Sequence, residues 1–160
     1  FDRLVMREGS KIGDLNYVSG IGSRSRKHFG TESERRAELV LQEHSAITGR
    51  HLIDCCNRIE IGRFTTIAGA RSQILTHAID IRRSLQTSAP VVIGQYCFVG
   101  TSSVILKGAV LPDFSVLGAN STLAHAFEEP YGIYSGVPAV RVRAIDKDSA
   151  YFHRTDAYVG

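Results

Sequence analysis

Six histidines are the side chains of this chain best suited to acid–base chemistry, because an imidazole ordinarily titrates at a pH of about 6.5. They are His28, His44, His51, His77, His125 and His153. His77 is a candidate for a general base; it follows a run of regular repeats and opens a segment, residues 78–89, where those repeats stop. A surface loop histidine without a catalytic role is the alternative interpretation.

The cysteines predict packing rather than covalent chemistry. Their number is odd, Cys55 and Cys56 are adjacent, and there is no C-x-x-C motif, so we expect free thiols in a reducing compartment. Cys97 falls in a column of small residues, which favours a packed corner residue over a nucleophile. No secretory or transit pattern is visible, and we expect a cytoplasmic protein.

Composition indicates one strand-rich domain. The chain has 160 residues, of which 43% are hydrophobic and 22% are charged, and this balance excludes a disordered protein. Ile and Val together number 27 against 11 Leu, and β-branched residues favour strands. No segment approaches the roughly 20 apolar residues of a membrane-spanning helix. The net charge of +3 is mild and spread along the chain, so we expect no nucleic-acid partner.

An internal repeat of six residues explains the excess of Ile and Val. One apolar column consists of Ile93, Val99, Ile105, Leu111, Leu117 and Leu123. A second column of small residues consists of Cys97, Ser103, Ala109, Ser115 and Ser121. An ordinary meander of strands has a period of two and gives no reason for this spacing, whereas a parallel β-helix does. Three hexads would make one 18-residue coil of triangular section, with the apolar column pointing inward.

The same period occurs earlier in the chain. Leu41, Ile47, Ile53 and Ile59 are six apart, and after a slip of two residues Ile61 and Ile67 continue the column. Gln73 falls on the next inward position, where it would be a buried, hydrogen-bonded residue. Residues 78–89 lose the small-residue column, which predicts a loop that leaves the helix.

We therefore predict a single domain, 1–160, with a β-helix core over residues 41–127. The charged insertion 23–38 is expected to form a solvated loop or a short polar helix. Lys11 to Asp14 could begin a further coil. In the tail, residues 128–160, we expect an extended segment over 131–145 and a short helix within 146–154.

The hexads from Ile93 to Ser121, followed by Ser135–Ala139 (SGVPA) and the basic run Arg141–Arg143, resemble hexapeptide-repeat acyltransferases. The similarity is greatest to the sugar and xenobiotic O-acetyltransferase branch and spans about residues 41–145. It implies a left-handed parallel β-helix and a homotrimer with acetyl-CoA in the groove between neighbouring subunits. It also implies acyl transfer to a hydroxyl or amine, most plainly that of a sugar or nucleotide sugar in polysaccharide biosynthesis.

The resemblance also implies roles for individual residues. His77 stands where the family has its catalytic histidine. The group that orients its ring is open, since Asp80 is three residues away, Asp54 or Glu60 could approach from a neighbouring coil, and a backbone carbonyl would also serve. The oxyanion donor would be the backbone N–H of Thr101, after Gly100.

Further positions are expected to bind the two substrates. The acetyl-CoA contacts would be Gly100, Thr101, Gly118, Ala119, Ala124, His125 and Arg143. The acceptor contacts would be Arg50, His51, Arg71 and Asp80, although a solvent-facing coil edge accounts equally for the first two. No metal is expected.

Two other classes share this repeat. Zinc carbonic anhydrases of the γ type need a His-x4-His pair, and no two histidines of this chain have that spacing. A non-catalytic β-helix used for assembly or binding remains the alternative function, and the presence of His77 argues against it.

Overall fold

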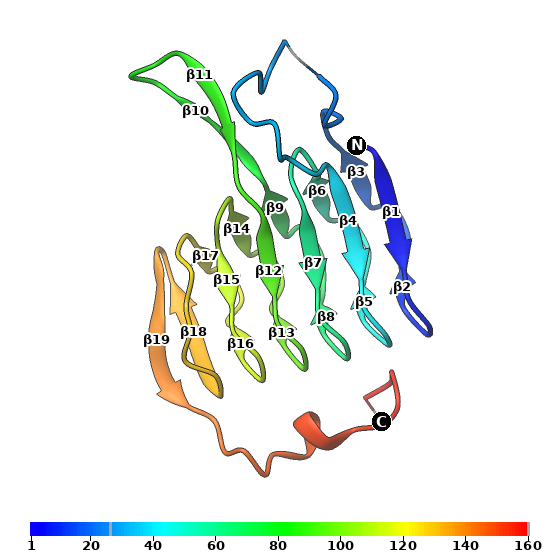
Figure 1. Ribbon diagram of the computed structural model, residues 1–160. Helices are drawn as coiled ribbons and strands as arrows, with labels where there is room; N and C mark the ends of the chain where they lie inside the picture. The colour runs from blue at the N-terminus through cyan, green and yellow to red at the C-terminus, as the bar shows by residue number, and fades with distance from the viewer. Residues whose placement is uncertain (26, 160) are drawn as a thin grey trace.

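Inward-pointing apolar residues at short intervals bend this chain into stacked triangular coils (Figure 1). The computed structural model describes residues 1–25 and 27–159. It forms a left-handed parallel β-helix, as predicted. Each coil contributes one strand to each of three sheets, which we name A, B and C in the order in which the chain visits them. The three edges of the prism are the AB, BC and CA edges.

The strands are short, as expected for hexads. Sheet A contains β1 (Arg3–Met6), β4 (Glu38–Leu41), β7 (Ile59–Ile61), β12 (Val91–Ile93) and β15 (Val110–Leu111). Sheet B contains β2 (Lys11–Ile12), β5 (Ala46–Ile47), β8 (Thr66–Ile67), β13 (Phe98–Val99), β16 (Val116–Leu117), β18 (Gly132–Gly136) and β19 (Ala139–Ala144). Sheet C contains β3 (Tyr17–Ser19), β6 (Leu52–Asp54), β9 (Gln73–Leu75), β14 (Val104–Leu106) and β17 (Thr122–Leu123).

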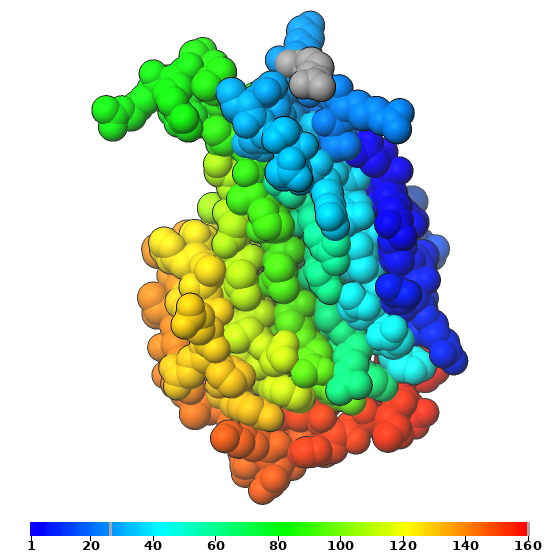
Figure 2. Space-filling view, in the orientation of Figure 1, coloured from blue at the N-terminus to red at the C-terminus, as the bar shows by residue number. Residues whose placement is uncertain are grey.

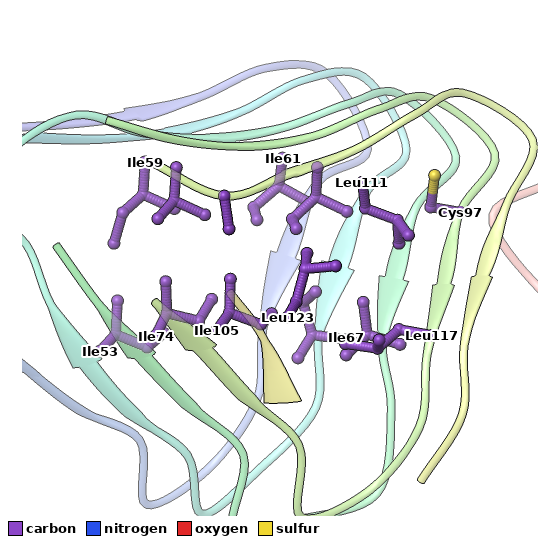
Figure 3. Close-up of a cluster of buried hydrophobic side chains, with 14 of the residues drawn as sticks. Ile53, Ile59, Ile61, Ile67, Ile74, Cys97, Ile105, Leu111, Leu117 and Leu123 are labelled. Carbon is purple, nitrogen blue, oxygen red and sulfur yellow. The ribbon is translucent and has the colours of Figure 1, made fainter. Parts of the chain in front are cut away.

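The predicted apolar column is the core of the prism (Figure 3). Ile93, Val99, Ile105, Leu111, Leu117 and Leu123 are all fully buried, as are Leu41, Ile53, Ile59, Ile61 and Ile67. The small-residue column is also buried, at the corners. Corners are tight because coils stack closely: a Cβ on Gly100 would lie 2.5 Å from the backbone nitrogen of Ala119 in the next coil.

The coils extend further toward the N-terminus than the predicted core of 41–127. Strand β1 pairs with β4, β2 with β5 and β3 with β6, so residues 3–19 form a first coil, as the Lys11–Asp14 pattern suggested. In the tail, β18 and β19 form an antiparallel pair, and a 3-10 helix, η1 (Ala150–His153), follows. None of the helical segments described has the length and apolar character needed to cross a bilayer.

The prediction for Gln73 is wrong. Gln73 is exposed, and Ile74 takes the inward position with 1% of its surface accessible. The corner before β9 holds one residue more than a regular hexad, with both Gly69 and Arg71 in the left-handed region. Sheet C pairs Leu52 with Gln73, 21 residues apart, because this added residue comes on top of the two-residue slip between Ile59 and Ile61. The last two coils repeat every 18 residues, as in the pair Val104–Thr122.

Aromatic side chains line the AB edge, one per coil. Phe64 stacks on Tyr96 at 4.8 Å between ring centroids, and Phe114 stacks on Tyr131 at the same distance. The C-terminal segment runs back along this edge, where the hydroxyl of Tyr151 donates to the carbonyl of Cys97 (Figure 1). The tail thus fastens the last coils to the earlier ones, a role that the sequence did not indicate.

The charged insertion is not a solvated loop throughout. Phe29, Arg35 and Ala37 are buried, and no part of the described segment is helical; residue 26 lies outside the described residues. The Arg35 guanidinium donates to the carbonyls of Ile21 and Gly22, each at 2.6 Å, and to the carbonyl of Cys56. These bonds from its two terminal nitrogens offset much of the cost of burying the guanidinium, although Nε has no partner among the described residues.

Residues 78–89 leave the β-helix as predicted, but as an ordered hairpin. Strand β10 (His77–Asp80) pairs antiparallel with β11 (Leu85–Ser88). Figure 2 shows this hairpin projecting from the CA edge beside the insertion. The Glu32 carboxylate joins the two by accepting from the N–H of Ser88 at 2.7 Å and from its hydroxyl.

Candidate active site

A histidine–carboxylate pair lies on the CA edge, at the base of the hairpin. His77 is the first residue of β10, and Asp54 is the last residue of β6 in the preceding coil. The Nδ1 atom of His77 lies 2.6 Å from Oδ2 of Asp54. Of the four orienting groups that the sequence left open, the structure selects Asp54.

The Asp54 carboxylate is a buried acceptor surrounded by donors. Its Oδ1 accepts from the N–H of Cys56 at 3.2 Å, and its Oδ2 accepts from the N–H of Thr76 at 3.1 Å and from the Thr76 hydroxyl at 3.3 Å. Burial alone would raise the pKa of Asp54, but hydrogen bonds from Cys56, His77 and Thr76 outweigh it and lower this pKa. An ionised Asp54 fixes the proton of His77 on Nδ1 and leaves Nε2 as the proton acceptor.

The other two carboxylates point elsewhere. Asp80 lies further along β10 and pairs with Arg83, with 2.7 Å between Oδ2 and Nε. Glu60 lies on sheet A, where it accepts from Gln42 and pairs with Arg58 at 2.8 Å. Asp80 lies on the hairpin that projects from the β-helix. It can contact the acceptor, as predicted, only if the acceptor extends as far as this hairpin.

The insertion shapes the environment of His77. The buried Phe29 packs edge-on against its imidazole, with 6.1 Å between centroids, and the Arg35 guanidinium lies 4.2 Å from the centre of the Phe29 ring. About a third of the His77 side chain is accessible, and no described residue hydrogen-bonds to Nε2. The ring is therefore held on one side and open on the other, as a general base requires.

The lowered pKa of Asp54 makes stability pH-dependent. An ionised Asp54 stabilises the native state fully above an unfolded-state pKa of about 3.9, and the contribution is lost as the pH falls through the lower native pKa. We expect the free energy of unfolding of Asp54→Asn to fall less steeply with acidification below about pH 4 than that of the parent chain. Urea denaturation at a series of pH values measures this slope. Equal slopes for the two proteins would contradict it, and Asp148→Asn, on the exposed tail, is the control.

The predicted oxyanion donor lies on a different edge. Gly100 and Thr101 follow β13, and Gly118 and Ala119 follow β16, so all four lie on the BC edge. Among the described residues, no acceptor is bonded to the N–H of Thr101 or of Ala119, and both residues are exposed. These free N–H groups are available to an incoming ligand. They are separated from His77 by the width of sheet C within one chain.

The predicted acceptor residues on that edge divide into two kinds. Arg50 and Arg71 are exposed in successive coils, and the N–H of Arg71 donates to the Arg50 carbonyl at 2.9 Å. His51 is only 3% accessible: its Nδ1 accepts from the N–H of Ser72 at 3.1 Å, and its Nε2 lies 3.0 Å from the Thr48 hydroxyl. Because both ring nitrogens are occupied, His51 is a corner residue, and the prediction that it contacts the acceptor does not fit this geometry. Burial also lowers its pKa.

The remaining predicted acetyl-CoA positions are spread over the molecule. Ala124 and the exposed His125 lie on the CA edge of the last coil, whereas Arg143 is exposed on β19. One chain therefore does not gather all the predicted CoA contacts into a single groove. A cleft of about 590 Å³ opens between the insertion and the hairpin base, lined by Glu32, Asn57 and Ser88 among others, and His77 is not among its lining residues.

The thiols are free and buried. Burial raises the pKa of Cys55 and Cys97 to about 12 and that of Cys56 to about 11. Cys97 is completely buried and its sulfur donates to the carbonyl of Pro112 at 3.1 Å, in keeping with its predicted role as a corner residue.

Sequence reasoning missed Thr76, Cys56, Phe29 and Arg35 as neighbours of the histidine–carboxylate pair. Thr76 directly precedes His77, and Cys56 comes two residues after Asp54, so both lie where a sheet C strand ends. No periodicity indicated Phe29 or Arg35, because the insertion follows no repeat.

No protein-family model matches the sequence. Several solved structures are similar in fold. A maltose O-acetyltransferase from Clostridium difficile 630 superposes with a TM-score of 0.69 at 19% identity, over 89% of this chain and 70% of that one. A hexapeptide-repeat acetyltransferase from Vibrio cholerae O1 biovar eltor, complexed with acetyl coenzyme A, gives 0.65 at 22% identity, over 88% and 73%.

An N-acyltransferase from Bacillus cereus, in complex with dTDP and 3-hydroxybutyryl-CoA, gives a TM-score of 0.68 at 15% identity, over 95% of this chain and 82% of that one. The chain has the hexapeptide-repeat acyltransferase fold. At these identities the similarity establishes architecture, and within the acyltransferase fold the function must be argued from the site.

Proposed function

We propose that this chain is a CoA-dependent acyltransferase that moves an acetyl group from acetyl-CoA to a hydroxyl or amine of a sugar or nucleotide sugar. The observation that carries the proposal is the pair formed by His77 and the buried Asp54 at the open CA edge. A base whose Nδ1–H is held by an ionised carboxylate has its Nε2 lone pair free for the proton of an acceptor.

The reaction then needs no further protein nucleophile. Nε2 of His77 takes the acceptor proton as the acceptor oxygen or nitrogen attacks the thioester carbonyl carbon. The negative charge that develops on the carbonyl oxygen requires N–H donors, and the unoccupied N–H of Thr101 is the proposed one. The tetrahedral intermediate collapses, the carbon–sulfur bond breaks, and His77 returns the proton to the CoA sulfur.

The residues present suit an acyl-CoA ligand. The row of free N–H groups at Thr101 and Ala119 can bind the pantetheine amides, and the exposed guanidiniums of Arg50, Arg71 and Arg143 can bind phosphates. The two neighbours that carry acetyl-CoA or 3-hydroxybutyryl-CoA support a CoA donor, and the one that carries dTDP supports a nucleotide-linked acceptor. Three free thiols support a reducing compartment such as the cytoplasm.

We propose a homotrimer, because His77 and Thr101 lie on different edges of the prism. Three parallel prisms around a threefold axis would set the CA edge of one copy against the BC edge of the next, and this arrangement completes the site. His77 would then come from one subunit and Thr101 from its neighbour.

Acetyl transfer tests the proposal directly. The purified full chain is incubated with labelled acetyl-CoA and a panel of sugars and nucleotide sugars, and both acetylated product and free CoA are measured. Acetyl-CoA at 100 times its Kd should stabilise the native state by about 2.7 kcal/mol, which raises Tm by roughly 5–10 °C for a chain of this size. Absence of both binding and transfer would leave the non-catalytic scaffold as the function.

Co-expression tests the shared site. His77→Ala removes the base and Thr101→Pro removes the N–H, so each variant alone should be inactive. Mixed trimers should regain activity, since one type of interface in them has an intact His77 facing an intact Thr101. Circular dichroism of each variant is the folding control, and no recovery with both variants folded would contradict a site between subunits.

A further inference from the structure

Three different metal-binding side chains, one of them the proposed base His77, converge at the CA edge. Asp54 and Cys56 end the sheet C strand of one coil, and the N–H of Cys56 turns back to bond Oδ1 of Asp54 at 3.2 Å. His77 comes from the next coil. A carboxylate oxygen of Asp54, the sulfur of Cys56 and a ring nitrogen of His77 all lie within 4.8 Å of one another. We propose that these three residues form a Zn²⁺ site, and that zinc bound there inhibits the enzyme by capturing its base.

The ligand set is one that zinc uses. Oxygen, thiolate sulfur and imidazole nitrogen at bond lengths of about 2.0–2.3 Å lie about 3.3–3.8 Å apart around a tetrahedral ion. The three atoms already approach this spacing, so shifts of about 1 Å suffice. A water molecule from solvent would provide the fourth ligand.

Cys56 differs from the other two thiols in its surroundings. Cys55 and Cys97 belong to the apolar core cluster, whereas Cys56 does not. Its sulfur lies at the polar CA corner, where it accepts from the N–H of Ile21 at 3.3 Å. A buried thiol placed against a carboxylate and an imidazole has no part in the proposed transfer, and its position is explained if it is a ligand.

Capture of the base follows from the proton balance. In the metal-free pair, Nδ1 of His77 carries a proton and Nε2 is free. Zinc takes Nδ1, so that proton moves to Nε2, while the thiol proton of Cys56 is released to solvent. With Nε2 protonated, His77 cannot accept the proton of an acceptor hydroxyl or amine. Inhibition therefore rests on the proposed function, whereas zinc binding does not.

Cobalt(II) is the probe for the site, because it reports its ligands by absorption. The full chain is titrated with Co²⁺ at pH 8, where release of the thiol proton is easier. We expect one ion per chain, a near-ultraviolet thiolate-to-cobalt band and the intense visible bands of tetrahedral coordination, all abolished by Zn²⁺. Cys56→Ser should lose the thiolate band and bind at least about 10-fold more weakly, whereas the adjacent Cys55→Ser keeps both.

A second variant protects the test against misfolding. His77→Ala changes a residue at the base of the exposed hairpin and should also lose the tetrahedral spectrum. The proposal is overturned if the parent chain shows no thiolate band, or if folded Cys56→Ser retains the metal affinity of the parent. Spectra that behave as expected without any acetyl transfer would support the zinc site and contradict the proposed function. Transfer that zinc does not inhibit would contradict the capture of the base.

Discussion

Replacing Asp54 with asparagine should lower kcat for acetyl transfer by about 10²–10⁴-fold, close to the effect of His77→Ala. The KM for acetyl-CoA should change little, because neither side chain is proposed to bind CoA. Both effects have one cause, the loss of a correctly oriented proton acceptor at Nε2.

Asparagine fails for a reason that the surroundings of Asp54 impose. The N–H of Cys56 donates to Oδ1 of Asp54, and the N–H of Thr76 donates to Oδ2, the oxygen that also lies beside His77. Asparagine keeps only one of these two oxygens. With that oxygen on the Cys56 N–H, its NH₂ group takes the place of Oδ2 and faces His77. Nδ1 then becomes the acceptor and the ring proton moves to Nε2, the tautomer that cannot act as a base.

Steady-state kinetics on purified variants measure the effect. The double variant should be about as slow as either single one, because the two residues act as a unit. Glu60→Gln is the matched control, since it makes the same carboxylate-to-amide change on sheet A and should leave kcat within about twofold. Parental turnover in His77→Ala would refute the mechanism, and parental turnover in Asp54→Asn would refute the orienting role of the carboxylate.

Ile74→Ala should reduce the free energy of unfolding by about 2–5 kcal/mol, whereas Gln73→Ala should change it by no more than about 0.5 kcal/mol. Ile74 is 1% accessible and packs inside the prism between Ile53 and Ile105, its neighbours in sheet C (Figure 3). Its truncation leaves a cavity that the stacked coils cannot close. Gln73 points to solvent, so its truncation removes no packing.

Urea unfolding followed by circular dichroism measures both values under one set of conditions. Ile105→Ala, one coil away on the same face, is the positive control and should resemble Ile74→Ala. The reverse order, a large loss from Gln73→Ala and a small one from Ile74→Ala, would restore the strict hexad register and contradict the structure at β9.

The stacked coils were largely predictable. The inward apolar residues and the small corner residues both recur every six residues, so their positions can be found from the sequence alone. The prediction failed at Gln73, where one extra residue in a corner shifts the register. It also described the 78–89 hairpin only as a loop, since pairing between β10 and β11 follows a period of two rather than six.

The candidate site was predictable in part. His77 was chosen mainly because the resemblance to hexapeptide-repeat acyltransferases implies a catalytic histidine at this break of the repeat, and Asp54 was one of several partners left open. Choosing among them required the register of sheet C, which pairs Asp54 with Leu75 and so sets its carboxylate beside the residues that follow β9. Arg35 and Phe29 were invisible as site residues because nothing in a charged segment marks the arginine that will be buried.

The sequence by itself determined the β-helix, its inward column and the break at His77, since all three are properties of spacing along the chain. Only the tertiary structure decided which carboxylate orients His77 and that Cys56 joins them. It also decided that Arg35 and Phe29 pack the insertion against the ring, and that His77 and Thr101 lie on separate edges. The physical reason is that contacts between coils depend on the number of residues in every corner between them. A single added residue there moves each later side chain by one register position.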